Sequence, residues 1–189
     1  MSSSDVYGTG SGARGLSEDS PLRPLSPYGA SKAAAELVCQ QIALQEGLDL
    51  VISRSFPHYG PLQRASFALP AFCRRIVLAR RSGEASIATG NLSPVRDYLH
   101  IDDVCRAYAL LLSRAEAGGV YNVCSGTGTS LAEIVSKLIE LAGGGLETKR
   151  DATLARASDV SVQVGDNGRL RALGWNRTVR LEDGLASLL

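Results

Sequence analysis

The sequence has little lysine and almost no net charge. Among its 189 residues there are 3 Lys against 17 Arg, and the 20 basic residues are balanced by 19 acidic ones. A formal charge of +1 gives no global field that would draw the chain to nucleic acid or to an anionic membrane. Any anionic ligand must therefore be bound locally, and the planar, two-pronged guanidinium group of arginine suits phosphate.

Metal-binding and membrane-spanning patterns are also missing. The 2 His lie at no metal-ligand spacing, no CxxC pair occurs, and the cysteines stand singly in apolar stretches at Cys39, Cys73, Cys105 and Cys124. We therefore predict no metal site and buried free thiols in a reducing compartment. The N-terminus has no signal pattern and no apolar run is long enough to span a bilayer, so we expect a cytoplasmic protein.

A third missing element is a Gly-rich turn of the GxGxxG type after an opening strand. Such a turn would hold the pyrophosphate of a dinucleotide at a helix N-terminus. What the chain does contain is 44% hydrophobic residues, enough for one domain or one and a half. Stretches of helical periodicity alternate with short apolar runs of strand length, which predicts an α/β fold with parallel strands.

The first half of the chain shows this alternation clearly. Apolar and small residues recur at helical spacing from Tyr28 to about residue 45, with Ser26 as a candidate N-cap and Pro27 in the first turn. Residues 48–56 form an apolar run of strand length. The pattern of residues 67–80 predicts a second helix. Pro70 must lie in the first turn of this helix or kink it.

The second half continues the pattern. "ASIA" and "RDYLHI" indicate short strands, Asp102 or Asp103 is expected to cap a helix running to about residue 115, and residues 118–126 indicate a strand. Ser130 to Glu133 has the spacing of a capping box and opens a helix to about residue 141. The tail indicates a weak strand at 146–149 and two short helices.

The motif that carries chemistry is "YGASK", which places Tyr28 and Lys32 on one helical face at i and i+4. A free phenol is a poor base at neutral pH, and a neighbouring cation favours its ionised form. The pair could therefore act as an acid-base couple. By itself the motif is weak, because an exposed Tyr beside an exposed Lys is an equally good interpretation.

The surrounding blocks add specificity. "SSSDVYG", "RSFPHYGP", "GNLSPVRDYLHIDDV", "GGVYNVCSG" and "GDNGRLRALGW", together with YxxxK, span almost the whole chain. In these blocks the sequence resembles the extended short-chain dehydrogenase/reductase family of NAD-dependent epimerases and dehydratases that modify nucleotide sugars. The wording of several blocks is most similar to the branch that acts on GDP-mannose derivatives.

The resemblance implies roles for particular residues. Tyr28 would exchange a proton with the sugar, Lys32 would hold the nicotinamide ribose and tune Tyr28, and the Ser3 hydroxyl would bond the reacting oxygen. Asp5 stands where dehydratases of the family carry a Glu, and a loop Asp bonding to the backbone is the alternative. The resemblance implies NAD or NADP as cofactor, bound by Tyr28, Lys32, Pro57 and His58.

Substrate recognition is also implied by the resemblance. Arg96 and Arg156, with Asp159 close by, would bind the nucleotide sugar through its phosphates, whereas a solvated surface Arg is the alternative for each. Relatives usually carry Asn where Pro57 stands, and Pro offers neither a side-chain amide nor a backbone N–H. A lone histidine such as His58 or His100 is more often structural than catalytic.

Two classes of function follow. The first is reduction of the 4-keto group of GDP-4-keto-6-deoxy-mannose with Tyr28 as proton donor, or else a 4,6-dehydratase or another sugar-nucleotide epimerase. The second is a catalytically silent binding fragment, favoured by the missing Gly-rich turn and by Pro57. Relatives imply a homodimer through the helix that contains Tyr28; the same face could instead pack internally.

The resemblance also implies a division of the chain. Residues 1–65 and 97–125 would be the remaining part of a Rossmann-like domain, and residues 66–96 and 126–189 a smaller domain that binds the sugar nucleotide. "MSSSDVYG" looks like a strand tip entered halfway through a domain. We therefore expect that the N-terminal half with its Gly-rich loop is missing, so that the chain is truncated or is completed by another chain.

Overall fold

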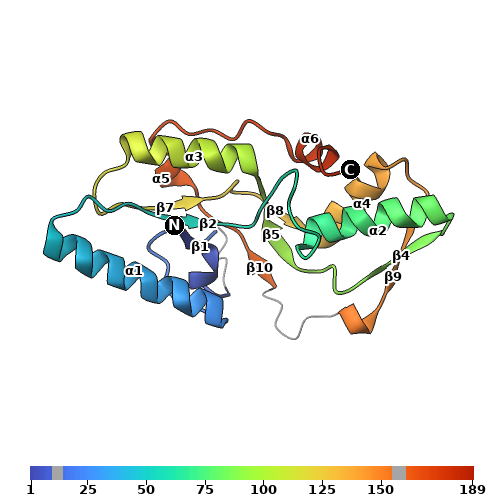
Figure 1. Ribbon diagram of the computed structural model, residues 1–189, viewed down its shortest axis with the longest axis horizontal. Coiled ribbons are helices and arrows are strands. Elements are labelled where there is room, and N and C mark those ends of the chain that lie inside the picture. The colour runs from blue at the N-terminus through green and yellow to red at the C-terminus, as the bar shows by residue number, and fades with distance from the viewer. Residues whose placement is uncertain (10–14, 155–160) are drawn as a thin grey trace.

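The computed structural model describes residues 1–9, 15–154 and 161–189 (Figure 1). Helices and strands alternate along the chain and most strand pairs are parallel, so the structure is an α/β fold as the periodicity predicted. None of the described helices is long and apolar enough to cross a membrane.

A three-stranded parallel sheet forms one end of the molecule. Its strands lie in the order β1 (Ser2–Ser3), β2 (Ile52–Ser55) and β7 (Val120–Val123). The connection from β1 to β2 contains the short helix η1 (Ser4–Val6) and the long helix α1 (Pro27–Glu46). Helix α3 (Ile101–Arg114) precedes β7, and Figure 1 shows α1 and α3 on opposite sides of the sheet.

The remaining strands form smaller sheets. Strand β5 (Val95–Asp97) pairs in parallel with β10 (Val162–Gln163) and antiparallel with β8 (Gly128–Ser130). Two parallel pairs complete the set. They are β3 (His58–Tyr59) with β6 (Leu99–His100), and β4 (Ser86–Thr89) with β9 (Glu147–Arg150).

Local sequence signals explain where α1 begins and ends. The Ser26 hydroxyl accepts a hydrogen bond from the Gly29 N–H at 3.0 Å, and Pro27 occupies the first helical position, so the predicted N-cap is confirmed. Gly47 ends the helix in the left-handed conformation with a φ of 66°. Apolar side chains on its outer surface are nevertheless exposed, namely Leu37, Val38, Ile42 and Leu44.

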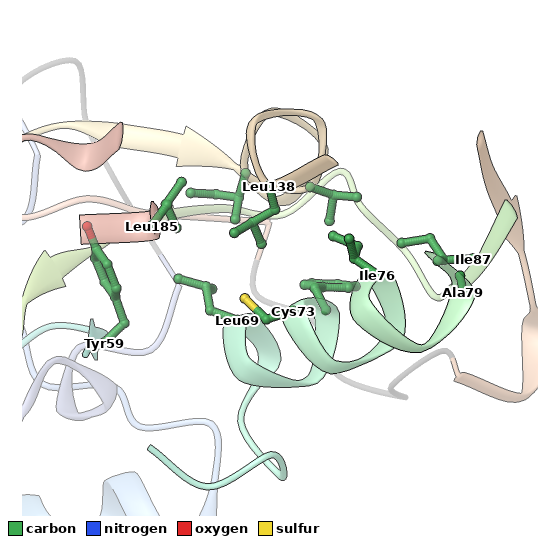
Figure 2. Packing of buried hydrophobic residues seen from close by; sticks show 11 residues of the cluster. Tyr59, Leu69, Cys73, Ile76, Ala79, Ile87, Leu138 and Leu185 are labelled. Atoms are coloured by element: carbon green, nitrogen blue, oxygen red, sulfur yellow. The ribbon is translucent and has the colours of Figure 1, made fainter. Parts of the chain in front are cut away.

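The helices α2 (Ala68–Ser82), α4 (Leu131–Leu141) and α6 (Leu181–Ala186) enclose the largest core. In Figure 2, Leu69, Cys73 and Ile76 on α2 face Leu138 on α4, with Leu185 of α6 beside them. Pro70 lies in the first turn of α2, where its missing N–H is harmless. The helical periodicity of 67–80 is thereby confirmed.

A second core cluster joins α3 and β7 to the tail of the chain. Leu170, on the short helix α5 (Gly168–Ala172), and Trp175 are buried against Val104 and Leu111 of α3. The indole N–H of Trp175 donates to the Asp103 carbonyl oxygen at 3.2 Å. The 3-10 turn η2 (Ala152–Leu154) follows β9.

Several local expectations need correction. Neither Asp102 nor Asp103 caps α3, because the His100 Nδ1 accepts the Asp102 N–H at 3.3 Å and both aspartates lie in the first turn. "RDYLHI" forms parts of two strands, β5 and β6, that pair with different partners. The expectation of buried thiols holds for Cys73 and Cys124, whereas two helical cysteines are exposed, Cys39 and Cys105.

Candidate active site

A cleft of about 720 Å³ lies where β1 and β2 end, between the first turns of α1 and of α3. Its wall includes all of the predicted catalytic residues and both residues of the "PH" dipeptide: Ser3, Asp5, Tyr28, Lys32, Pro57 and His58. Residues separated by up to 55 positions in the chain therefore share one cavity. The cleft is consistent with the strand-end location at which α/β sheets bind ligands.

Ser3 reaches the cleft from the last position of β1. Strand β1 pairs in parallel with β2, and this register puts Ser3 directly opposite Ser55. The Ser3 hydroxyl accepts a hydrogen bond from the Asp5 N–H at 3.2 Å, which starts the turn of η1. With that bond made, the hydroxyl proton of Ser3 remains available for donation to a ligand.

Tyr28 and Lys32 lie on neighbouring turns at the start of α1, as their spacing predicted. The Lys32 ammonium is 5.7 Å from the centre of the Tyr28 ring and also donates to the Met1 carbonyl oxygen at 3.4 Å. The Tyr28 side chain is 54% exposed, and within the described residues its hydroxyl has no hydrogen-bond partner. The phenol is thus accessible, with a cation nearby.

Helix α1 and η1 approach one another closely because of Gly29. A Cβ atom at this position would lie 2.5 Å from the Asp5 carbonyl oxygen, so any side chain would push the two segments apart. This close approach brings the first turn of α1 next to Ser3 and Asp5. Asp5 itself is half-buried at the cleft wall.

Pro57, His58 and Gln63 also line the cleft. The His58 Nδ1 lies 3.1 Å from the Phe56 carbonyl oxygen, and the Gln63 side-chain amide donates to the His58 carbonyl oxygen at 3.1 Å. These bonds hold the loop after β2 in place. Tyr59, also in the wall, is buried, which raises the pKa of its phenol to about 12 and keeps it protonated at neutral pH.

Arg96 is not part of the cleft wall, although Tyr98 from the same sequence block is. Its strand neighbours in register are Gln163 on β10 and Thr129 on β8, and its guanidinium donates to the Val95 carbonyl oxygen at 2.9 Å. Thr129 lines a second cavity of about 410 Å³ together with Tyr98, which also lines the cleft. Arg156 and Asp159 lie outside the described residues.

Sequence reasoning missed two hydroxyls of the cleft. The Ser55 and Tyr108 oxygens lie 2.6 Å apart, and both residues line the cavity. Ser55 faces Tyr108 on α3, whereas its neighbour Arg54 faces α1. No motif marks these residues, since their proximity to Ser3 depends on the register of β1 against β2 and on how α3 packs.

The chain as a whole matches the family described as GDP-mannose 4,6 dehydratase, over residues 1–188. The chain belongs to this family. Its relatives include NAD(P)-dependent dehydratases and reductases of nucleotide sugars, and both the family model and a reductase of the GDP-sugar branch match this chain.

Individual relatives agree with this assignment. The chain is 34% identical over 192 residues to GDP-6-deoxy-D-mannose reductase of Pseudomonas aeruginosa, a match that covers 100% of the chain and 63% of the reductase. The structure of RMD from Pseudomonas aeruginosa complexed with NADPH has a TM-score of 0.91 at 35% identity, covering 99% of this chain and 63% of that one.

A relative of another specificity has the same fold. The structure of UDP-glucose 4-epimerase from Thermus thermophilus, a complex with NAD, gives a TM-score of 0.86 at 30% identity, over 99% of this chain and 60% of that one. Structural relatives within the superfamily therefore bind either NADPH or NAD.

The comparisons correct one expectation from the sequence. We expected the N-terminal half of the enzyme to be missing, but the chain spans 63% of the length of the reductase and the family match runs from residue 1 to residue 188. The expectation that the N-terminal half is missing is therefore wrong, and the chain spans about 63% of the length of these relatives. That expectation rested on the absence of a Gly-rich turn and on the appearance of "MSSSDVYG" as a strand tip, and neither observation measures how much of a relative a chain matches.

Proposed function

We propose that the protein is an NAD(P)-dependent nucleotide-sugar oxidoreductase, and that it reduces the 4-keto group of GDP-4-keto-6-deoxy-mannose. The observation that supports this most is the shared cleft: Ser3, Tyr28 and Lys32 line one cavity at the carboxyl ends of parallel strands. The 34% identity to GDP-6-deoxy-D-mannose reductase favours the reductase within the family.

In this proposal Tyr28 donates its phenolic proton to the sugar O4 as the carbonyl is reduced. Lys32, with its ammonium 5.7 Å from the ring centre, stabilises the phenolate that remains. The Ser3 hydroxyl, which accepts a hydrogen bond from the Asp5 N–H, donates a hydrogen bond to the same oxygen while negative charge develops there and keeps its own proton.

The cofactor fits the residues that are present. The start of α1 and the "PH" dipeptide line the same cleft, so Tyr28, Lys32, Pro57 and His58 would hold the nicotinamide end of NAD(P)H. When bound, the nicotinamide supplies the hydride. Lys32 offers three N–H donors for the hydroxyls of the ribose.

The nucleotide part of the substrate is proposed to run from the cleft past Arg96. Tyr98 lines both the cleft and the second cavity, and Thr129 of that cavity is the strand partner of Arg96. Arg96 lines neither cavity itself, but it is the strand partner of a residue that lines the second one, and a guanidinium group suits a diphosphate. Arg156 and Asp159 remain proposed contacts on the basis of their motif.

We also propose that the chain divides as its blocks suggest. Residues 1–65 and 97–125 would form the Rossmann-like unit that supplies Ser3 and Tyr28, and residues 66–96 and 126–189 the unit that binds the sugar nucleotide. The core of α2, α4 and α6 supports the second unit. Leu170 and Trp175 of the tail pack against α3, so α5 would join the two units.

A 4,6-dehydratase is the second candidate, favoured by the position of Asp5. This carboxylate lines the same cleft as Tyr28 and would serve in the elimination of water. Its side chain is shorter than that of the glutamate in dehydratases, which makes reduction the preferred reaction. A dehydratase would turn over GDP-mannose, whereas a reductase would oxidise NADPH only when the 4-keto sugar is added.

The first test is thermal unfolding of the chain with NADPH, NADH, GDP-mannose or UDP-glucose added separately. A ligand that binds the folded state alone raises the midpoint by mass action. We expect NADPH or NADH, and GDP-mannose, to raise it. Stabilisation by GDP-mannose without either dinucleotide would instead support a catalytically silent binding protein, and no stabilisation by any of the four would contradict the proposal.

The second test is the substitution Tyr28→Phe. Removing the phenolic oxygen takes away the proton donor without changing the ring, so we expect kcat for reduction of the 4-keto sugar to fall about 10²–10⁴-fold. NADPH oxidation followed by absorbance measures this effect. Lys149→Met, on exposed β9, is the matched control and should turn over like the wild type; an unchanged rate in Tyr28→Phe would exclude the proposed role.

A further inference from the structure

Helix α1 is held to the rest of the molecule by very few side chains. Of its 20 residues, all of them described, Gly29 and Glu36 are the buried ones. Its apolar residues do not anchor it, because Leu37 and Leu44 are 65% and 82% exposed. The close approach of Gly29 to η1 and the partly buried Ala33 are contacts of small residues, and a helix without a buried stripe of large apolar side chains has little packing to set its rotation or its height along the sheet.

Glu36 makes the strongest contact between α1 and the sheet. The Arg54 guanidinium of β2 donates from Nε to Glu36 Oε1 at 3.0 Å and from Nη2 to Glu36 Oε2 at 2.7 Å. The two side chains are 7% and 4% exposed, so the pair is shielded from water. A two-pronged contact of this kind fixes direction as well as distance.

Arg54 is itself held on its other side. Its Nη1 donates to the Tyr7 hydroxyl at 3.1 Å and to the Glu18 carbonyl oxygen at 2.9 Å, and the guanidinium carbon lies 5.0 Å from the centre of the Tyr7 ring. Tyr7 in turn donates to the Asn122 side-chain oxygen of β7 at 2.7 Å. The arginine therefore has a fixed orientation before α1 is considered.

Each residue of the pair is a neighbour, on its own helix or strand, of residues that line the candidate active site. Tyr28, Lys32 and Glu36 are spaced by four residues and share one side of α1. Arg54 precedes Ser55, which pairs with Ser3 in the sheet. One ion pair therefore connects the helix that holds the phenol and the ammonium to the strand edge that holds the serine hydroxyl.

Stability alone does not account for such a pair. Burying two charges costs desolvation energy, and replacing a buried ion pair by apolar residues is often neutral or stabilising. Apolar contacts would permit small rotations and shifts of α1, whereas the fork of Arg54 accepts a carboxylate in one orientation. Burial on its own would lower the pKa of Arg54, but the hydrogen bonds to Glu36 and Tyr7 raise it, so the arginine stays charged.

We propose that Glu36 and Arg54 are positioning residues, which fix the rotation and height of α1 so that Tyr28 and Lys32 stay beside Ser3. Their effect on turnover rests on the proposed function. Their effect on the position of the helix does not, and it is measured separately.

The natural cysteines allow that measurement on the intact chain. Cys39 on α1 and Cys105 on α3 are exposed, whereas Cys73 and Cys124 are buried. Burial raises the pKa of Cys73 to about 11, which protects it further from thiol reagents. Nitroxide labels at the exposed pair report the distance between α1 and α3 by pulsed electron paramagnetic resonance, with labelled chain diluted into unlabelled chain so that only distances within one chain are measured.

The decisive variant is Glu36→Leu combined with Arg54→Met, which removes both charges and leaves no unpaired ion. We expect cooperative unfolding to be retained and the inter-label distance distribution, narrow in the wild type, to widen or split. Lys137→Met is the control, because it removes an exposed ion pair with Glu182 and should leave the distribution narrow. A distribution in the double variant as narrow as that of the wild type overturns the proposal.

A second variant covers failure of the first to fold. Glu36→Gln keeps the shape of the side chain and weakens its two-pronged contact with Arg54, so the distance distribution should widen to a smaller extent. If the double variant is unfolded and the distance distribution of Glu36→Gln is as narrow as that of the wild type, the proposal is overturned. In an active protein, kcat should fall about a hundredfold in the double variant with KM little changed. A wild type without turnover contradicts the proposed function, whereas the distance measurement still decides the positioning role.

Discussion

At the scale of the residue, Asp97 shows how a buried charge is accommodated beside the proposed substrate path. Its carboxylate accepts the Ser125 N–H at 2.7 Å, the Ser125 hydroxyl at 2.6 Å, the Gly126 N–H at 2.9 Å and the Gly165 N–H at 3.3 Å. Burial raises its pKa, and the four hydrogen bonds act against that shift. Asp97 thus joins β5 to the loops after β7 and β10.

The substitution Asp97→Asn tests this interpretation. An amide nitrogen would face backbone N–H groups that need an acceptor, so we expect the free energy of unfolding to fall by about 1–3 kcal/mol. Urea denaturation at neutral pH measures the loss. Asp49→Asn, on an exposed loop, is the matched control and should not change the free energy of unfolding. Equal stabilities of the two variants would show that the hydrogen bonds to the Asp97 carboxylate do not stabilise the fold.

At the scale of the element, α4 is the helix whose start the sequence specifies most completely. The Ser130 hydroxyl accepts the Glu133 N–H at 3.1 Å, and Glu133 accepts the Ser130 N–H at 2.8 Å. These bonds to Ser130 lower the pKa of Glu133 below its ordinary value of 4.5. The capping box predicted from "SLAE" is therefore confirmed.

The lowered pKa of Glu133 makes the stability of α4 depend on pH. A carboxyl group with a lower pKa in the folded state contributes stability above its unfolded pKa and loses it as the pH falls through the folded pKa. We expect Glu133→Gln to be less stable than the wild type at pH 7. The two proteins should be equally stable once the pH is below the folded-state pKa of Glu133.

Urea titrations across this acid range measure the difference. Glu140→Gln, an exposed position on the same helix, is the control and should follow the wild type throughout. A constant difference between Glu133→Gln and the wild type at every pH would mean that the charge of Glu133 does not contribute.

At the scale of the whole molecule, the outer surface of α1 is the feature that a single chain leaves unexplained. Leu37, Val38, Ile42 and Leu44 are 65%, 57%, 48% and 82% exposed and lie on one helix. Exposed apolar groups that gather in this way mark interaction surfaces. We therefore propose a homodimer in which two copies of α1 pack together.

Light scattering after size exclusion tests the homodimer. We expect the wild type to have the mass of two chains and Leu44→Glu to have the mass of one, because a buried unpaired carboxylate is costly in the interface. Leu112→Glu, at a position on α3 that is 91% exposed, is the control and should remain dimeric. A wild type that is monomeric at every concentration would exclude the homodimer.

Local features of the fold follow from the sequence alone. Ser26 and Pro27 open α1, "SLAE" opens α4, and Pro70 falls in the first turn of α2, because each depends on residues within one or two turns of one another. The YxxxK spacing likewise places Tyr28 and Lys32 on adjacent turns. Periodicity was sufficient for the α/β class, and the sequence blocks were sufficient for the family.

Only the tertiary structure decided which distant residues meet. Ser55 stands beside Ser3 through strand register, and Tyr108 reaches Ser55 from α3. His100 caps α3 in place of the expected aspartates, and Arg54 binds Glu36 from across 18 residues. These contacts depend on how strands align and how helices dock, and many alignments satisfy the same local pattern until packing and burial select one.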